Sequence, residues 1–127
     1  MNILIIEDER YSAERLCALI AQIAPNANTL AILESVEETV NWFKSNTLPD
    51  LIFLDIHLAD TNSFEIFKRI KVDCPIIFTT AYNEYAIQAF KVNSIDYLLK
   101  PIDLEELKIS ITKYHNLYTT TTLEPAI

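Results

Sequence analysis

Four charged residues of this chain stand at the ends of short runs that are rich in Ile and Leu. They are Glu7, Asp8, Asp55 and Lys100. Apolar runs without polar alternation are typical of strands that are buried on both faces of a parallel sheet. Ligands of such sheets bind beyond the carboxyl ends of the strands, so the four side chains should converge on one pocket. Carboxylates that face a lysine can hold a hard divalent cation together with the phosphoryl group that it neutralises.

The elements that must position these residues follow from the hydrophobic pattern, which alternates strand and helix five times. The predicted strands are residues 2–6, 29–33, 51–54, 75–78 and 95–99. The predicted helices are residues 10–24, a helix capped by Ser35 and Glu38, and residues 64–72, 84–92 and 104–117. The aromatic side chains expected in the core are Trp42, Phe43 and Phe64.

Five strand–helix units with short connections predict an α/β fold. We expect a doubly wound, five-stranded parallel sheet in the order 2-1-3-4-5, with five helices on both faces. The first and third strands are neighbours in that order. Glu7, Asp8 and Asp55 would therefore lie within reach of one cation.

Composition limits the classes of function. Half of the 127 residues are hydrophobic, which is enough for the core of one domain. The net charge of −8 argues against nucleic-acid binding by this domain itself, because such binding needs a basic face. No apolar run approaches the roughly 18 residues of a membrane span, and the first strand begins too early for a signal peptide. We expect a cytoplasmic protein in which Cys17 and Cys74 are buried, reduced thiols.

The chain contains no glycine. This excludes the glycine-rich phosphate loops on which common nucleotide-binding sites depend. The Thr-rich tail, residues 118–127, ends the helical periodicity and is predicted to be a linker or a frayed end. The domain is thus predicted to cover residues 1–117.

Taken together and in this order, the residues at the strand ends resemble the receiver domains of two-component response regulators. The resemblance covers about residues 1–117. Its pieces are Glu7-Asp8, Leu54-Asp55-Ile56, Thr79-Thr80-Ala81 and Tyr97-Leu98-Leu99-Lys100-Pro101. Residues 80–90, continued by residues 96–101, look most like the LytTR-type (LytR/AlgR) regulators.

The resemblance implies a site of covalent phosphorylation. Asp55 is the expected phosphate acceptor, because attack of its carboxylate on a phosphoryl group gives an aspartyl phosphate. The expected ligands of Mg²⁺ or Mn²⁺ are Glu7, Asp8, Asp55 and the backbone carbonyl of His57. Lys100 would pair with a phosphoryl oxygen, and a cis bond to Pro101 would aim it.

The resemblance also implies a switch that a sensor histidine kinase would set. Thr80 is the expected switch hydroxyl, and Tyr97 is the aromatic residue that turns inward when a phosphoryl group draws Thr80 toward it. The expected homodimer and output face comprises Tyr85, Ala86, Ala89, Phe90 and Tyr97. The chain would not be an enzyme beyond its own phosphorylation and dephosphorylation. LytTR-type regulators carry a DNA-binding domain after the receiver, so DNA binding is expected through a domain missing from these residues.

Other interpretations stay open. Taken alone, Glu7 and Asp8 could be acidic residues that favour a helix start, and Tyr97 could be a static residue of the sheet. A stand-alone receiver, or a pseudo-receiver that acts by protein–protein interaction, is one alternative function. A phosphatase of small substrates is another, although His57 stands where haloacid-dehalogenase enzymes carry a second acid.

The chain departs from the family pattern at two places. Many receivers have Asp-Asp where this chain has Glu7-Asp8, but the longer side chain still reaches a cation. Many also carry a proline and a glycine after the acceptor, and residues 56–63 contain neither. No ligand is lost, yet the conformation of this loop and the autodephosphorylation rate stay open.

Overall fold

The computed structural model describes residues 1–82 and 94–118. Its centre is a five-stranded parallel sheet in the order β2-β1-β3-β4-β5. The strands are β1 (Asn2–Ile6), β2 (Asn28–Leu33), β3 (Leu51–Asp55), β4 (Ile76–Thr80) and β5 (Ser94–Leu99). The predicted fold class and strand order are confirmed.

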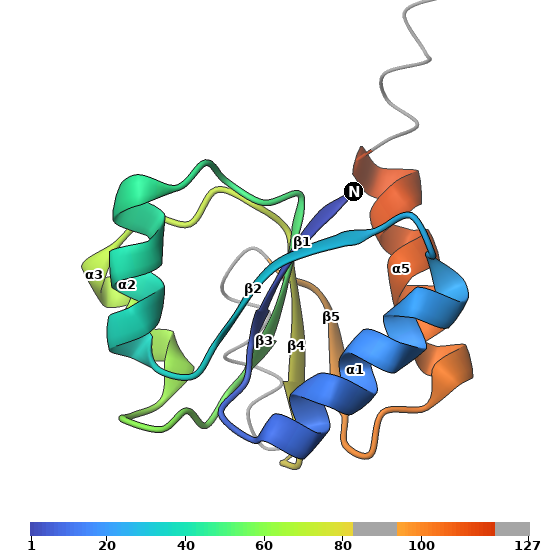
Figure 1. Ribbon diagram of the computed structural model, residues 1–127, viewed down its shortest axis with the longest axis horizontal. Coiled ribbons are helices and arrows are strands. Elements are labelled where there is room, and N and C mark those ends of the chain that lie inside the picture. The colour runs from blue at the N-terminus through green and yellow to red at the C-terminus, as the bar shows by residue number, and fades with distance from the viewer. Residues whose placement is uncertain (83–93, 119–127) are drawn as a thin grey trace, which may run out of the picture.

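Helices cover both faces of this sheet. They are α1 (Arg10–Ile23), α2 (Val36–Ser45), α3 (Ile66–Arg69) with the 3-10 turn η1 (Ser63–Glu65) before it, and α5 (Leu104–Tyr118). Figure 1 shows α2 and α3 on one side of the sheet and α1 and α5 on the other. The predicted helix 84–92 lies outside the described residues.

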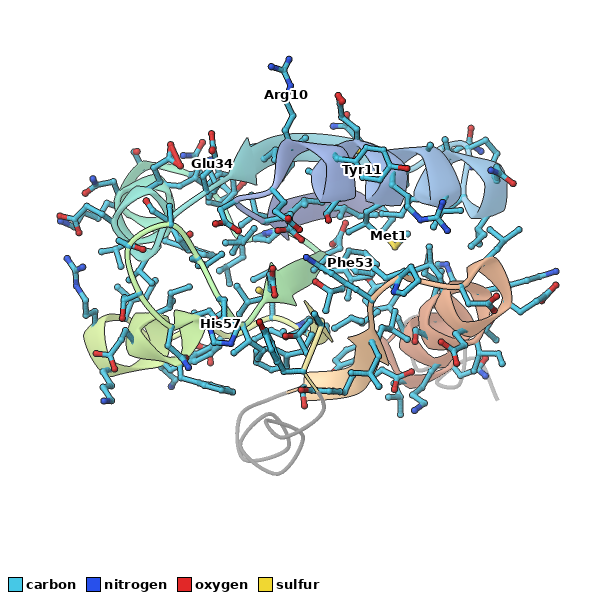
Figure 2. All side chains as sticks on the ribbon, turned by 90° about the horizontal axis from the view of Figure 1, so that it is seen from below. Met1, Arg10, Tyr11, Glu34, Phe53 and His57 are labelled. Carbon is cyan, nitrogen blue, oxygen red and sulfur yellow. The ribbon has the colours of Figure 1, made fainter. Side chains whose placement is uncertain are left out.

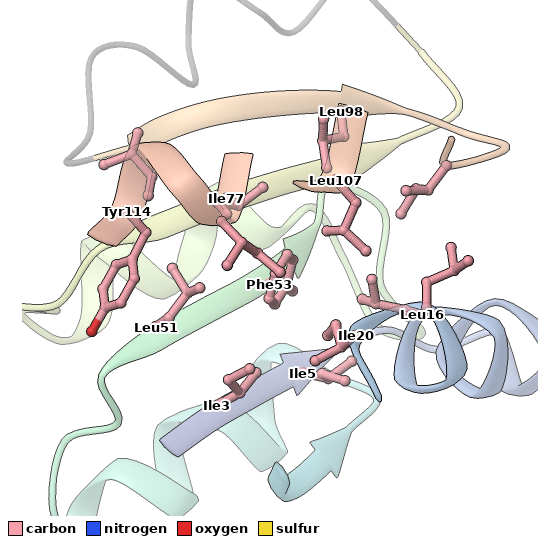
Figure 3. Close-up of a cluster of buried hydrophobic side chains, with 14 of the residues drawn as sticks. Ile3, Ile5, Leu16, Ile20, Leu51, Phe53, Ile77, Leu98, Leu107 and Tyr114 are labelled. Carbon is pink, nitrogen blue, oxygen red and sulfur yellow. The ribbon is translucent and has the colours of Figure 1, made fainter. Parts of the chain in front are cut away.

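Two hydrophobic cores form because strand side chains alternate between the faces. Ile3 and Ile5 of β1 join the core under α1 and α5, and Leu4 and Ile6 join the core under α2 and α3. Figure 3 shows the first core, in which Phe53 of β3 lies among side chains from the sheet and both helices. Burial on both faces explains why β1 and β3 are apolar along nearly their whole length and β4 along its first three residues.

Side chains cap two helices near the strand ends. Ser35 Oγ accepts from the backbone N–H of Glu38 at 3.0 Å, as the capping box predicts. The Glu38 carboxylate accepts from the N–H of Glu34, one residue earlier than in the usual reciprocal bond. Asp103 accepts from the N–H groups of Glu105 and Glu106, which fixes the start of α5.

Several predictions of local structure are wrong. The predicted helix 64–72 is much shorter, because the chain becomes extended at Ile70 and turns back toward β4. The aromatic residues predicted in the core are only partly buried, since they lie at the rim of the second core: Trp42, Phe43 and Phe64. Cys17 is likewise only half-buried, whereas Cys74 is buried, and burial raises the pKa of the Cys74 thiol to about 12.

β4 is longer than predicted, and this matters for the site. It continues to Thr80 because Thr79 pairs with Leu98 and Thr80 pairs with Leu99 of β5. Both threonines are buried. The last residues of β4 therefore belong to the sheet and are placed as firmly as its apolar part.

Candidate functional site

Three predicted carboxylates meet at the edge of the sheet where the strands end. Ile6 of β1 pairs with Leu54 of β3, so Glu7 and Asp55 follow neighbouring positions. Glu7, Asp8 and Asp55 offer oxygen atoms that all lie within 4.8 Å of one another. Glu7 and Asp55 are only 4% and 6% exposed. Figure 2 views the molecule from this edge, with Tyr11 near the start of α1 and His57 after β3.

Lys100 joins these carboxylates from the carboxyl end of β5, the outermost strand next to β4. Its backbone N–H donates to the carbonyl of Thr80 at 2.8 Å, which continues the pairing of β4 and β5. Its Nζ donates to Asp55 Oδ2 at 2.9 Å and to Glu7 Oε1, and Glu9 lies 3.8 Å away. The bond between Lys100 and Pro101 is cis, as the resemblance predicts.

The electrostatics of this cluster favour an added positive charge. Burial is the main cause that raises the pKa of the Glu7 carboxyl to about 7; the Asp55 charge acts in the same direction, and the hydrogen bond from Lys100 opposes both. Burial alone would lower the pKa of Lys100, but its bonds to Glu7 and Asp55 raise it. Lys100 is therefore a cation at neutral pH, and one ammonium group faces more than one acid.

The donor set fits a hard divalent cation. Three carboxylates supply oxygen ligands from two neighbouring strands, which is the chemistry that Mg²⁺ and Mn²⁺ prefer. The His57 side chain is exposed, and its ring packs edge-to-face on Tyr82 with centroids 4.9 Å apart. The backbone of His57 pairs with Asn62 across the loop that follows β3. The metal role of its carbonyl stays a prediction.

Thr80 and Tyr97 meet at a residue that the sequence analysis did not select. Thr80 is fully buried, and its Oγ1 accepts from the backbone N–H of Tyr82 at 3.3 Å. The hydroxyl of the half-buried Tyr97 donates to the carbonyl of Tyr82. Both predicted switch residues thus hold the same residue. No local pattern marks Tyr82; only its place two residues after Thr80 could have suggested it.

A cavity of about 290 Å³ lies beside Lys100. Tyr11 and Arg15 of α1 line it, together with Pro101 and the charged groups of Glu7 and Lys100. It lies between α1 and the connection after β5 and borders Glu7 and Lys100 of the cluster, but Asp8 and Asp55 are not part of its lining. The sequence analysis missed this cavity because its walls come from segments far apart in the chain.

The predicted output face is described only in part. Tyr85, Ala86, Ala89 and Phe90 lie outside the described residues, so Tyr97 alone can be placed. Its role in a dimer stays a prediction. Among the described residues, no helix combines the length and apolar character needed to cross a bilayer.

Comparison with known families and sequences gives consistent results. The family model described as "Response regulator receiver domain" matches residues 3–112. The sensory transduction protein LytT of Enterococcus faecalis is 38% identical over 116 residues, and the match covers 89% of this chain and 47% of that protein. LytT of Bacillus anthracis is 36% identical over 117 residues, covering 90% and 47%. The chain therefore spans about half the length of these curated relatives.

Solved structures share the fold. The response regulatory domain of protein mrkE from Klebsiella pneumoniae superposes with a TM-score of 0.83 at 24% identity, covering 94% of this chain and 99% of that one. A two-component response regulator from Clostridium difficile gives a TM-score of 0.78 at 28% identity, covering 91% and 96%. These similarities extend over nearly all of the sheet and its helices.

Proposed function

This chain belongs to the response regulator receiver domain family, and from that premise we propose that it is a phosphorylation-activated switch with Asp55 as acceptor. A two-component receiver implies a sensor histidine kinase as its phosphate donor. The observation that carries the proposal is the buried Asp55 carboxylate, which lies 2.9 Å from Lys100 Nζ and beside two further acids. An ordinary solvated strand end would not bury this many charges together.

In the proposed reaction, an oxygen of Asp55 attacks the phosphorus of a phosphohistidine. The new O–P bond forms as the P–N bond breaks, and the imidazole leaves with that electron pair. Lys100 Nζ lies 2.9 Å from Asp55 Oδ2, which supports the proposal that its charge would pair with an incoming phosphoryl oxygen. Burial excludes bulk water from Asp55 and strengthens these charge interactions.

A divalent cation, Mg²⁺ or Mn²⁺, belongs to this proposal. Glu7, Asp8 and Asp55 would hold it with the His57 carbonyl. When bound, it neutralises negative charge on the carboxylates and on the transferred group. The raised pKa of Glu7 supports this assignment, because the cluster lacks enough positive charge to keep every acid ionised.

The switch would act through Tyr82. An aspartyl phosphate adds roughly −1.5 to −2 of charge and three acceptor oxygens. Thr80 is the hydroxyl proposed to turn toward them, and doing so alters its bond to the N–H of Tyr82. Because Tyr97 holds the carbonyl of the same residue, the rearrangement would reach β5 and the output face. The phosphoryl group would shift an equilibrium between two such arrangements.

The output remains part of the proposal. A phosphorylation-dependent homodimer would form through the face that contains Ala89 and Tyr97, and DNA would be bound by a domain beyond this chain. Ala89→Arg should abolish dimerisation in the presence of an acyl phosphate, as measured by light scattering after gel filtration. A dimer that persists in this variant would place the interface elsewhere.

The test of the switch is intact-mass analysis after incubation with acetyl phosphate and Mg²⁺. The wild-type chain should gain one phosphoryl mass of about 80 Da, and EDTA or Asp55→Asn should abolish the gain. Asp73→Asn is the matched control, because it makes the same substitution at an exposed aspartate. No gain under conditions that preserve acyl phosphates would reject the switch and favour a pseudo-receiver that acts by binding alone.

A further inference from the structure

The loop after β3, residues 56–62, is tied to the start of α2. In this β3 loop, Asp60 Oδ1 accepts from the N–H of Val36 at 2.9 Å, and Oδ2 accepts from the N–H of Glu37 at 3.1 Å. The first N–H groups of a helix have no partner within the helix. Ser35 caps the next one, at Glu38. Two side chains from different segments therefore share the cap of α2.

Backbone contacts strengthen this attachment. The N–H of Ala59 donates to the carbonyl of Glu34 at 3.1 Å. Asp60 Oδ1 also accepts from the N–H of Thr61, so the carboxylate organises the loop as well as the helix. Leu58 is 8% exposed and packs in the core under α2 and α3. The middle of the β3 loop is thus held by hydrogen bonds on one side and by burial on the other.

The charge of Asp60 suits this position. Desolvation raises the pKa of its carboxyl, but hydrogen bonds from Val36, Glu37 and Thr61 hold the pKa below its ordinary value. The positive end of the helix dipole favours an anion at the same place. Asp60 therefore stays ionised at neutral pH, and its bonds to α2 are charge-assisted.

The same loop connects Asp55 to this attachment. His57 pairs with Asn62, and the N–H of Ser63 donates to the carbonyl of Ile56 at 2.7 Å. The peptide of His57 thus lies between the end of β3 and the part of the loop fixed by Asp60. Neither glycine nor proline defines the turn in this chain. The attachment to α2 adds to the hydrogen bonds within the loop and is the contact that ties its path to another segment of the chain.

We propose that Asp60 is a positioning residue for the cation site: by capping α2 from the β3 loop, it fixes the backbone that follows Asp55. This inference rests on the proposed function, since it concerns the same site. Asp60 itself is not a ligand. Its removal would let the His57 peptide move away from the carboxylates, and the site would bind Mg²⁺ less tightly.

The experiment compares two caps of one helix. Asp60→Ala and Ser35→Ala each remove a cap of α2, but only Asp60→Ala frees the β3 loop. The dissociation constant of Mg²⁺, measured by calorimetry below both unfolding temperatures, should rise about tenfold in Asp60→Ala, the size of effect known for supporting residues around metal ligands. It should be unchanged in Ser35→Ala. Without metal, amide hydrogen exchange at residues 57–61 should accelerate in Asp60→Ala alone.

Two further variants test whether the effect of Asp60 comes from its hydrogen bonds to α2, from its negative charge or from misfolding of the variant. Glu37→Gln removes one negative charge at the same helix end but leaves the N–H that Asp60 binds, so Mg²⁺ affinity should stay near wild type. Asp60→Asn keeps one acceptor oxygen, so its Mg²⁺ affinity should fall between those of wild type and Asp60→Ala. This variant replaces Asp60→Ala in the comparison if Asp60→Ala does not fold. Equal Mg²⁺ affinity in Asp60→Ala and Ser35→Ala would overturn this inference alone. A wild-type chain that binds no Mg²⁺ would overturn the proposed metal site as well.

Discussion

Two segments leave the sheet beside Asp55, and they are held in different ways. The β3 loop is attached to α2 through Ala59 and Asp60 and is anchored in the core by Leu58. The segment Ala81-Tyr82 after β4 is held by two side chains, Thr80 and Tyr97, that carry the proposed switch. One segment is fixed by contacts that a phosphoryl group does not touch. The other depends on groups that a phosphoryl group would recruit.

This difference separates binding from signalling. A cation site needs ligands that keep their places, and the β3 loop would supply a fixed backbone for the proposed one. A switch needs an element with two arrangements of similar free energy. A hydroxyl that can exchange a backbone partner for a phosphoryl oxygen provides such an element. Lys100 connects the strands from which both segments start. Its backbone N–H donates to the carbonyl of Thr80 in β4, and its Nζ donates to Asp55 in β3.

The largest expected effect comes from removing that connection. Lys100→Met leaves Glu7 and Asp55 buried without their cation, so the metal-free protein should lose about 3 kcal/mol of stability toward denaturant. Added Mg²⁺ should stabilise this variant more than wild type. Lys113→Met is the matched control, since Lys113 is 46% exposed and lies 3.7 Å from Asp96, and it should change stability by less than about 1 kcal/mol. Equal losses in the two variants would show that Lys100 is not the cation that balances the site.

The next effect concerns pH, and we expect it at the cation site, where Glu7 titrates. The folded protein holds the proton of Glu7 up to a pKa of about 7, compared with 4.5 in the unfolded chain. Raising the pH from 4.5 to 7 therefore removes stability from the metal-free protein, because the unfolded chain releases this proton first. Mg²⁺ needs the ionised carboxylate, so its affinity should rise by up to about tenfold per pH unit below 7 and level off above.

Calorimetric titration with Mg²⁺ between pH 5.5 and 8.5 would measure this dependence. Glu7→Gln should bind more weakly and lose most of the slope, because it removes the titrating group. Asp60 keeps its charge throughout this range, since its pKa lies below the ordinary value, so the attachment of the β3 loop should not titrate. An unchanged slope in Glu7→Gln would assign the proton to another group.

The sequence predicts the ends of the strands better than the two segments that follow them. Strand order and the meeting of Glu7, Asp55 and Lys100 could be predicted because buried parallel strands are contiguous apolar runs whose ends share one edge. The cap of α2 by Asp60 could not, because it joins residues 24 positions apart and leaves no local pattern. Tyr82 was missed for a different reason. Its role comes from backbone atoms, which every residue type offers.

The same limit explains the error at α3. The helical periodicity of residues 64–72 is real as a pattern, but the chain must return to the start of β4 within a few residues. An extended backbone at Ile70 makes that return, while Ile70 and Val72 still pack against the second core. Tertiary packing overrides local preference where a connection is short.

The smallest expected effect lies where the β3 loop ends, at Ser63. This residue is fully buried. Within the described part of the chain, its Oγ is the one buried side-chain nitrogen or oxygen atom without a hydrogen-bond partner. Its backbone N–H, by contrast, holds the loop through Ile56. Ser63→Ala should therefore raise stability by about 1 kcal/mol, because it removes a desolvated hydroxyl and keeps the backbone bond. The affinity for Mg²⁺ should not change, since the path of the loop is preserved.

Ser110 provides the matched control for this prediction. It is also fully buried, but its Oγ donates to the carboxylate of Asp96. Ser110→Ala should lower stability by about 1–2 kcal/mol, because it removes one hydrogen bond from that half-buried carboxylate, which keeps only the N–H of Tyr97 and the more distant Lys113. Denaturant titrations of both variants would measure the contrast. If Ser63→Ala were as destabilising as Ser110→Ala, the hydroxyl of Ser63 would have a partner, such as a buried water, and the side chain as well as the backbone would hold the β3 loop.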